Sequence, residues 1–182
     1  LYMQLRGVSH KGSGDIANAI YDLKTSTSAD SLTVDFDGFT YLKNVRAGLD
    51  AVFHIDMDKK LFELKDNNLY INQLKAKGNG SVQLTDKETM RIQADIATLG
   101  NSFGELISVF PYLSAYNTVK ATGNAAFKAS VKGDFNAAKS IMPAFNVSLD
   151  VKNGAARYEG LDLDIHQVNA LVDIKSSRPD MK

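Results

Sequence analysis

Apolar and polar side chains alternate strictly along residues 119–131 of the chain. The odd positions are apolar or small, and they are Val119, Ala121, Gly123, Ala125, Phe127, Ala129 and Val131. The even positions are polar except for Ala126. A period of two is typical of a β-strand with one buried and one solvated face. At about 3.3 Å per residue this strand spans roughly 40 Å, more than twice the usual length.

Several other segments repeat this alternation. They cover residues 32–36, 47–57, 90–96, 145–151, 161–165 and 168–174. Residues 15–28 fit either a helical or a strand face, and the Thr and Ser run at their end favours a strand. We therefore expect about ten to twelve strands in all.

Turn-forming residues separate these segments. Asp37-Gly38, Asn67-Asn68 and residues 78–80 predict turns. Asn153-Gly154 predicts a two-residue hairpin that pairs Val151 with Ala156. The apolar parity changes between residues 71 and 74, which predicts a β-bulge or bend near Asn72-Gln73.

One segment departs from the strand pattern, at residues 102–112. Four apolar side chains there have helical spacing, namely Phe103, Leu106, Ile107 and Phe110. Ser102 is a suitable N-cap and Pro111 a stop, so the pattern predicts one short apolar helix over about 102–110. We expect this helix to act as a plug that fills the interior.

The predicted fold class is mainly β, a single β-rich segment over residues 1–182. Long antiparallel strands would form a curved sheet, an open sandwich or a groove, because short turns join them and one face is apolar. The first residues already have strand character and the tail resembles a break, so we expect a piece of a larger polypeptide.

Composition narrows the function. The 21 basic and 21 acidic residues give a formal net charge of +0, which disfavours a nucleic-acid partner. The absence of cysteine excludes disulfides and thiolate chemistry. The sequence contains no run of about 18 apolar residues, so it predicts no membrane-spanning helix.

Candidate chemistry is sparse. Asp162, Asp164 and His166 share one strand face and can contribute ligands to a divalent ion, but no second cluster complements them. The simpler interpretation is a solvated sheet face, and the same applies to His10 and His54. The sequence therefore predicts no catalytic residues, no metal, no cofactor and no enzymatic activity.

Four stretches resemble the AsmA-like family, the AsmA/TamB-type proteins of gram-negative bacteria. Residues 14–42 resemble its "GD…DL…T…L…DG..YL" run, and residues 103–112 resemble "F..LLS.IP..Y". Residues 120–135 resemble "KASG…G..KG.Y", and residues 142–158 resemble "MPAF…L.V.NG.F.Y". Ala156-Arg157 departs from that last pattern, where a bulky apolar residue is usual.

The resemblance implies a periplasmic β-rich body, anchored in the inner membrane by parts of the full-length protein that lie outside this sequence. It further implies an apolar groove that conducts phospholipids between the inner and outer membranes, and a role in outer-membrane biogenesis. Lipid acyl chains would then be the partners. An acyl chain needs a continuous dry surface, since burying each methylene gains about 0.8 kcal/mol.

We expect the groove to be lined by Val119, Ala121, Ala125, Phe127, Val131, Phe145, Val147, Leu149 and Val151. The same residues can instead pack a closed sandwich core without a ligand. A second hypothesis is a structural or protein-binding envelope domain that uses strand addition at an exposed edge. An open apolar trough would favour lipid, and a filled core would favour a scaffold.

Overall fold

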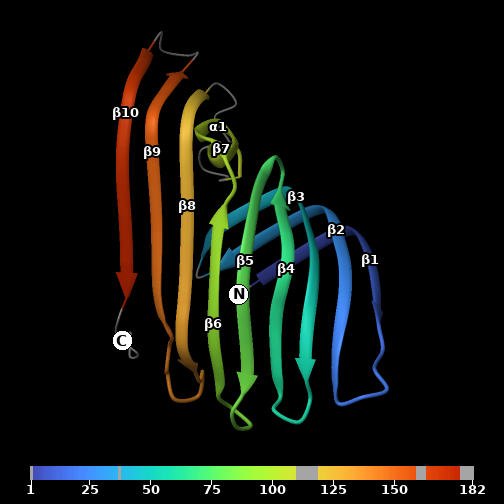
Figure 1. Ribbon diagram of the computed structural model, residues 1–182. Helices are drawn as coiled ribbons and strands as arrows, with labels where there is room; N and C mark the ends of the chain where they lie inside the picture. The colour runs from blue at the N-terminus through green and yellow to red at the C-terminus, as the bar shows by residue number, and fades with distance from the viewer. Residues whose placement is uncertain (1, 37, 110–118, 159–162, 177–182) are drawn as a thin grey trace.

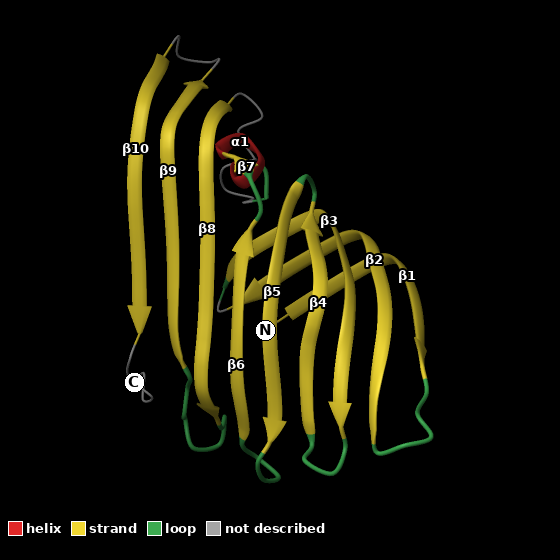
Figure 2. Cartoon of the chain, viewed as in Figure 1, coloured by secondary structure: helices red, strands yellow, loops and turns green. Residues whose placement is uncertain are grey.

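The computed structural model describes residues 2–36, 38–109, 119–158 and 163–176. They form one open antiparallel sheet of ten strands with a single short helix, as the sequence predicts (Figures 1 and 2). The strands are β1 Tyr2–Gly14, β2 Ile20–Phe36, β3 Phe39–Asp56, β4 Leu61–Ile71, β5 Leu74–Leu84, β6 Met90–Thr98, β7 Asn101–Ser102, β8 Val119–Phe135, β9 Ala144–Tyr158 and β10 Leu163–Ser176. The helix α1 spans Phe103–Ile107.

Strand order follows chain order. Each strand pairs with the next, from β1 to β6 and then β8 to β10, while the short β7 pairs with β8. Within the described residues, β1 and β10 are the outermost strands of this meander. The longest predicted strand is confirmed, because β8 continues the alternation to Phe135. β1 continues without interruption through the polar residues 9–14 and ends at Gly14.

The turns predicted at Asn67-Asn68 and at residues 78–80 are wrong, because both segments lie inside strands. The chain reverses instead at Asn72-Gln73, where a bulge or bend was predicted. The tight turn lies at Asn72-Gln73, where Ile71 pairs with Leu74. Asn67 lies inside β4 at an irregularity, where its Oδ1 accepts a hydrogen bond from Gly78 N at 2.9 Å and its Nδ2 donates to Gly78 O. The side-chain amide of Asn67 takes the place of a backbone partner for Gly78. β4 therefore continues through Asn67 where a turn was expected, and residues 78–80 stay within β5.

The predicted hairpin at Asn153-Gly154 is also wrong. β9 runs through both residues, and Val151 pairs with Ala125 on β8 and with Ala170 on β10. The left-handed backbone that Asn153 adopts (φ 50°) forms a bulge here instead of a turn.

Bulges align across neighbouring strands in two rows. One row crosses β8, β9 and β10 at Gly123 (φ 103°), Asn153 and Gln167 (φ 57°). The other crosses β2 and β3, with a register shift after Ala29 and a left-handed Asn44 (φ 53°), and it lies beside the left-handed Gly7 of β1 (φ 60°), where the β1–β2 register does not shift. Bulges bend and twist strands, and β1 to β3 turn sharply to run across behind β4 and β5 (Figure 1).

The helix begins as the sequence predicts. Ser102 Oγ accepts a hydrogen bond from Glu105 N at 3.1 Å, and Glu105 Oε2 accepts one from Ser102 N at 2.9 Å. This capping box satisfies two otherwise unpaired N–H groups. The helix ends at Ile107, earlier than predicted, and Phe110 lies outside the described residues.

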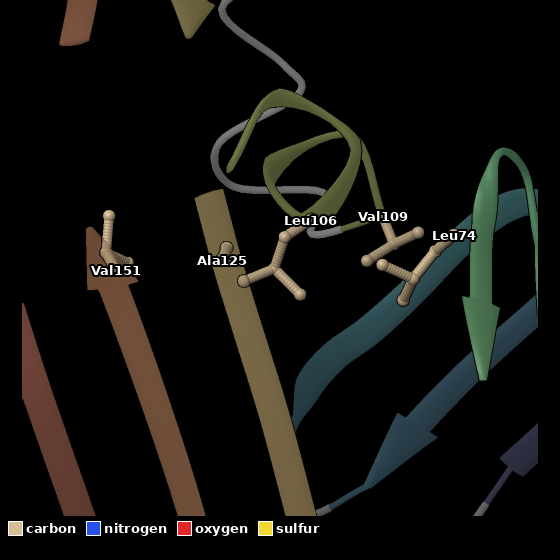
Figure 3. Packing of buried hydrophobic residues seen from close by; sticks show 5 residues of the cluster. All are labelled: Leu74, Leu106, Val109, Ala125 and Val151. Atoms are coloured by element: carbon tan, nitrogen blue, oxygen red, sulfur yellow. The ribbon is translucent and has the colours of Figure 1, made fainter. Parts of the chain in front are cut away.

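The helix packs on the sheet through a helix cluster, which we define as Leu74, Leu106, Val109, Ala125 and Val151. Figure 3 shows Leu106 and Val109 reaching down from the helix segment toward Ala125 on β8 and Leu74 on β5. Leu42, from the bent part of β3, packs against the same cluster. This cluster is small and lies at one end of the apolar face, while further buried apolar residues, such as Val45, Ala51 and Ile55, lie along β3.

We expect acid to weaken the β3–β4 turn. Asp56 is buried, and its side chain accepts hydrogen bonds from Lys59 N at 2.9 Å and Lys59 Nζ at 2.8 Å. The bond from the Lys59 ammonium, helped by the backbone bond, lowers the pKa of Asp56 below its usual value of 3.8. Stability from a lowered carboxyl pKa is present above the unfolded-state pKa and disappears as pH falls through the folded-state pKa. Denaturant unfolding below about pH 4 should therefore show a decline that is shallower in Asp56→Asn; equal slopes would contradict this role.

Candidate apolar trough

Antiparallel pairing collects the apolar positions of successive strands on one face of the sheet, which we call the apolar face. One row of directly paired residues crosses six strands, in the order Phe53, Leu64, Gly80, Ala94, Val131 and Phe145. A neighbouring row contains Gly78, Ile96, Ala129, Val147 and Ile174. Gly80 and Ala94 are small residues in the middle of the first row, and Gly78 and Ala129 are small residues on either side of Ile96 in the second. The face is therefore hollowed at its centre.

This hollow, which we call the trough, has a volume of about 460 Å³. Its apolar lining consists of Leu49, Leu64, Leu69, Ala94, Ile96, Ala129, Val131, Phe145 and Val147. Most of these side chains are half-buried, so the surface they form is open. An open apolar concavity is the type of surface that binds apolar ligands.

A second hollow of about 450 Å³ adjoins the trough. The two share Leu49 and Leu69, and the second continues over Leu23, Phe53 and Ala47 toward β1. The shared leucines join the two hollows on the same face. Together they extend the apolar surface from β9 to β1.

The structure divides the predicted groove residues into three groups. Val131, Phe145 and Val147 line the trough. Ala125 and Val151, at 7% and 2% exposure, are covered in the helix cluster, and Phe127 and Leu149 pack beside it. Ala121 is half-buried on the far side of Gly123, and the side chain of Val119 lies outside the described residues.

The predicted plug residues sit beside the trough. Phe103 and Leu106 pack on the helix cluster, and Ile107 is half-buried. None of the described residues of α1 lines the trough. The helix therefore closes one end of the apolar face and leaves the trough itself open.

Sequence reasoning missed the half of the trough that comes from β3 to β6. Leu49 and Ile96 lie in predicted strands, and Leu64 and Leu69 lie on β4, but no groove role was predicted for any of them. The signal that could have identified these residues is the same alternation of apolar and polar positions that marks β8. Only the pairing register shows that these positions lie opposite Val131 and Phe145 on one face.

The opposite, outer face carries a polar hollow of about 480 Å³. Its charged lining is balanced, with Lys77 and Lys128 against Asp66 and Asp95. Asn146 borders it, and its Oδ1 is a buried oxygen without a hydrogen-bond partner in the described part of the chain. Balanced charge gives this hollow no preference for an anion or a cation.

The residues considered for chemistry do not assemble into a centre. His54 Nδ1 lies 2.7 Å from Asp22 Oδ1, and His10 Nδ1 lies 2.8 Å from Thr27 Oγ1. Asp164 lies 3.6 Å from Arg157 Nε, and His166 is exposed. Asp162 falls outside the described residues. Within the described ranges, no three His, Asp or Glu side chains cluster closely enough to hold a metal ion.

Comparisons with protein-family models, curated proteins and solved structures found no match for this chain. Of the helical segments that the structure describes, none is long and apolar enough to cross a membrane.

Proposed function

We propose that this chain is a non-enzymatic segment of an AsmA-like envelope protein whose trough holds lipid acyl chains. The observation that carries the proposal is the open trough of about 460 Å³, lined mainly by nine apolar side chains from five strands. In this proposal the full-length protein is periplasmic, anchored in the inner membrane, and handles phospholipids in outer-membrane biogenesis. The sequence motifs that resemble the family support this assignment.

The physical argument is one of solvation. The trough leaves apolar side chains such as Leu64 and Val131 half-exposed, although they are the residues that folding normally buries. Burying ten methylenes of an acyl chain against them would gain about 8 kcal/mol before the cost of ordering the chain is subtracted. The continuation past Leu49 and Leu69 provides length for an extended chain.

The second candidate function is a structural or protein-binding envelope domain. Its support is the pair of strands at the ends of the described sheet, β1 and β10, each of which carries exposed apolar side chains, including Leu171 at 68% and Tyr2 at 56%. A binding partner would add a strand to one edge. This candidate makes no use of the trough.

The lipid proposal predicts that Ala129→Asp removes bound lipid. Ala129 lies at the floor of the trough between Ile96 and Val147, and a carboxylate there would have to lose its hydration when an acyl chain enters. Native mass spectrometry of the purified protein, followed by lipid extraction, should find phospholipid on the original chain and at least about tenfold less on the variant.

The matched control is Ala126→Asp, which makes the same change on the same strand. Ala126 is exposed and pairs with Asp150 on the outer face. This variant should keep its lipid, and circular dichroism should show the same strand content in all three proteins. Absence of lipid on the original chain, or equal loss in both variants, would contradict the proposal and favour the scaffold.

A further inference from the structure

The polar hollow of about 480 Å³ on the outer face lies over the middle of the sheet, between β4 and β9. Besides Asn67, which is bonded to Gly78, its polar side chains are Asp66, Lys77, Asn79, Asp95, Lys128, Ser130 and Asn146. None of these side chains is in a hydrogen bond or an ion pair with another described residue. Polar groups that gather in a concavity in this way are available to orient a polar ligand.

The acceptors of the polar hollow form one row across three strands. Asp95 on β6 pairs with Ser130 on β8, and Ser130 pairs with Asn146 on β9. Ser130 is short and half-buried, so the space above it is bordered by Asp95 on one side and by Asn146 on the other. An ammonium group carries three N–H donors. The row therefore offers one acceptor for each of them.

The side chain of Asn146 supports a ligand at this place. Its Oδ1 is buried and accepts no hydrogen bond from the described part of the chain. A buried acceptor without a donor is costly, and an N–H group of a ligand would remove that cost. The terminal torsion of asparagine has a broad energy profile, and no hydrogen bond to a described side chain or backbone group resists the rotation that turns Oδ1 into the hollow.

The lysines of the polar hollow lie in the neighbouring row. Lys77 on β5 and Lys128 on β8 both pair with Ala97 on β6. The small side chain of Ala97 leaves a space between them, where a carboxylate would accept hydrogen bonds from both ammonium groups. Asp66, on β4, borders the hollow on the side of Lys77 away from Ala97.

We propose that the polar hollow binds a dipeptide, with its ammonium group over Ser130 and its carboxylate over Ala97. This inference goes beyond the lipid proposal and does not depend on it. Ser130 and Ala97 are diagonal neighbours on adjacent strands, so they are about 7 to 8 Å apart. Two extended residues span about 7 Å. A single amino acid carries both charges on one Cα, too close together to reach both rows.

The balanced charge of the hollow fits this ligand. Two lysines and two carboxylates line it, which favours neither a simple anion nor a simple cation. A dipeptide has no net charge, but it presents a positive end to the acceptor row and a negative end to the lysines. Both ends are then matched without a net charge in the site.

Isothermal titration calorimetry with alanylalanine tests the proposal. The dipeptide should bind, and three relatives should bind at least about tenfold more weakly. They are N-acetyl-alanylalanine, which lacks the ammonium group, alanylalanine amide, which lacks the carboxylate, and free alanine, which is too short. Absence of binding at millimolar alanylalanine, or equal affinity for a blocked form, would overturn the proposal. Equal affinity for free alanine would overturn the assignment of a dipeptide.

Two variants locate the site on the protein. Lys128→Ala removes a donor to the carboxylate and Asn146→Leu removes an acceptor for the ammonium group, so each should weaken alanylalanine binding about tenfold. Asn146→Leu keeps a similar side-chain shape and removes a buried oxygen without a partner, so thermal unfolding should show no loss of stability. A loss of stability with unchanged binding would make Asn146 a structural residue and overturn its role in the site.

The matched control is Lys132→Ala. Lys132 is exposed on the same strand and the same face as Lys128, but it pairs with Gln93 and does not line the hollow. This variant should bind alanylalanine with the original affinity. An equal loss in Lys132→Ala and Lys128→Ala would mean that only the overall charge of the face matters, and it would overturn the site.

Discussion

Replacing Ala125 with Asp should lower the free energy of unfolding by at least about 3 kcal/mol. Ala125 is 7% exposed on β8, and the helix cluster covers it with Leu106, Val109 and Val151. A carboxylate in this apolar site would have no polar partner from the cluster, so it must be buried as an unpaired charge or expel the helix. Urea unfolding monitored by circular dichroism measures the change.

Ala126→Asp provides the comparison. The two alanines are neighbours in sequence, but Ala126 is exposed on the outer face beside Asp150 and Lys128. Surface substitutions usually change stability by less than about 0.5 kcal/mol, and the like charge of Asp150 across the strand adds at most about 1 kcal/mol here, well below the loss expected for Ala125→Asp. If the two variants were equally stable, the covering of Ala125 by α1 would be wrong.

Gly123→Ala should destabilise the chain by about 3 kcal/mol. Gly123 has φ 103°, a conformation that disfavours any side chain. An added Cβ would lie 2.5 Å from Asn153 O and 2.7 Å from Gly154 Cα, both of them backbone atoms of β9. β9 would have to move away, and the row of bulges across β8 to β10 would open.

Gly100→Ala separates backbone strain from this collision. Gly100 also has a left-handed backbone (φ 59°), but an added Cβ there meets no atom within 4 Å. The cost should therefore be the strain alone, about 1 kcal/mol. Thermal unfolding of both variants compares them, and an equal loss would mean that the close approach of β9 to Gly123 does not matter.

The strands and the cap of the helix were predictable because they depend on local signals. The alternation in β8 and the Ser102 cap involve residues close together in sequence, and both are confirmed. The Asn turns were not predictable in the same way. Asn67, Asn72 and Asn153 all favour a left-handed or irregular backbone, but only Asn72 is at a hairpin turn. Which of the three reverses the chain depends on the partner strand.

The candidate site shows the same division. The alternation identified Val131, Phe145 and Val147 as apolar, and these residues line the trough. It assigned Ala125 to the same surface, although α1 covers this part of the strand. Periodicity along one strand predicts which face of the sheet a side chain occupies, but it does not predict how deeply that side chain is buried. Burial depends on which other segments of the chain pack on that face.

The two rows of bulges also constrain how the gene can change length. At Asn153 three steps of β9, from Lys152 to Ala155, lie opposite two steps of β8, from Thr122 to Asn124. Losing Asn153 would therefore remove the extra residue and keep Tyr158 in phase with β8 and β10. Losing a residue elsewhere in β9, where the ladder is regular, would instead turn every side chain beyond it to the other face. Among evolutionary relatives, gaps in β9 should accordingly fall at Asn153.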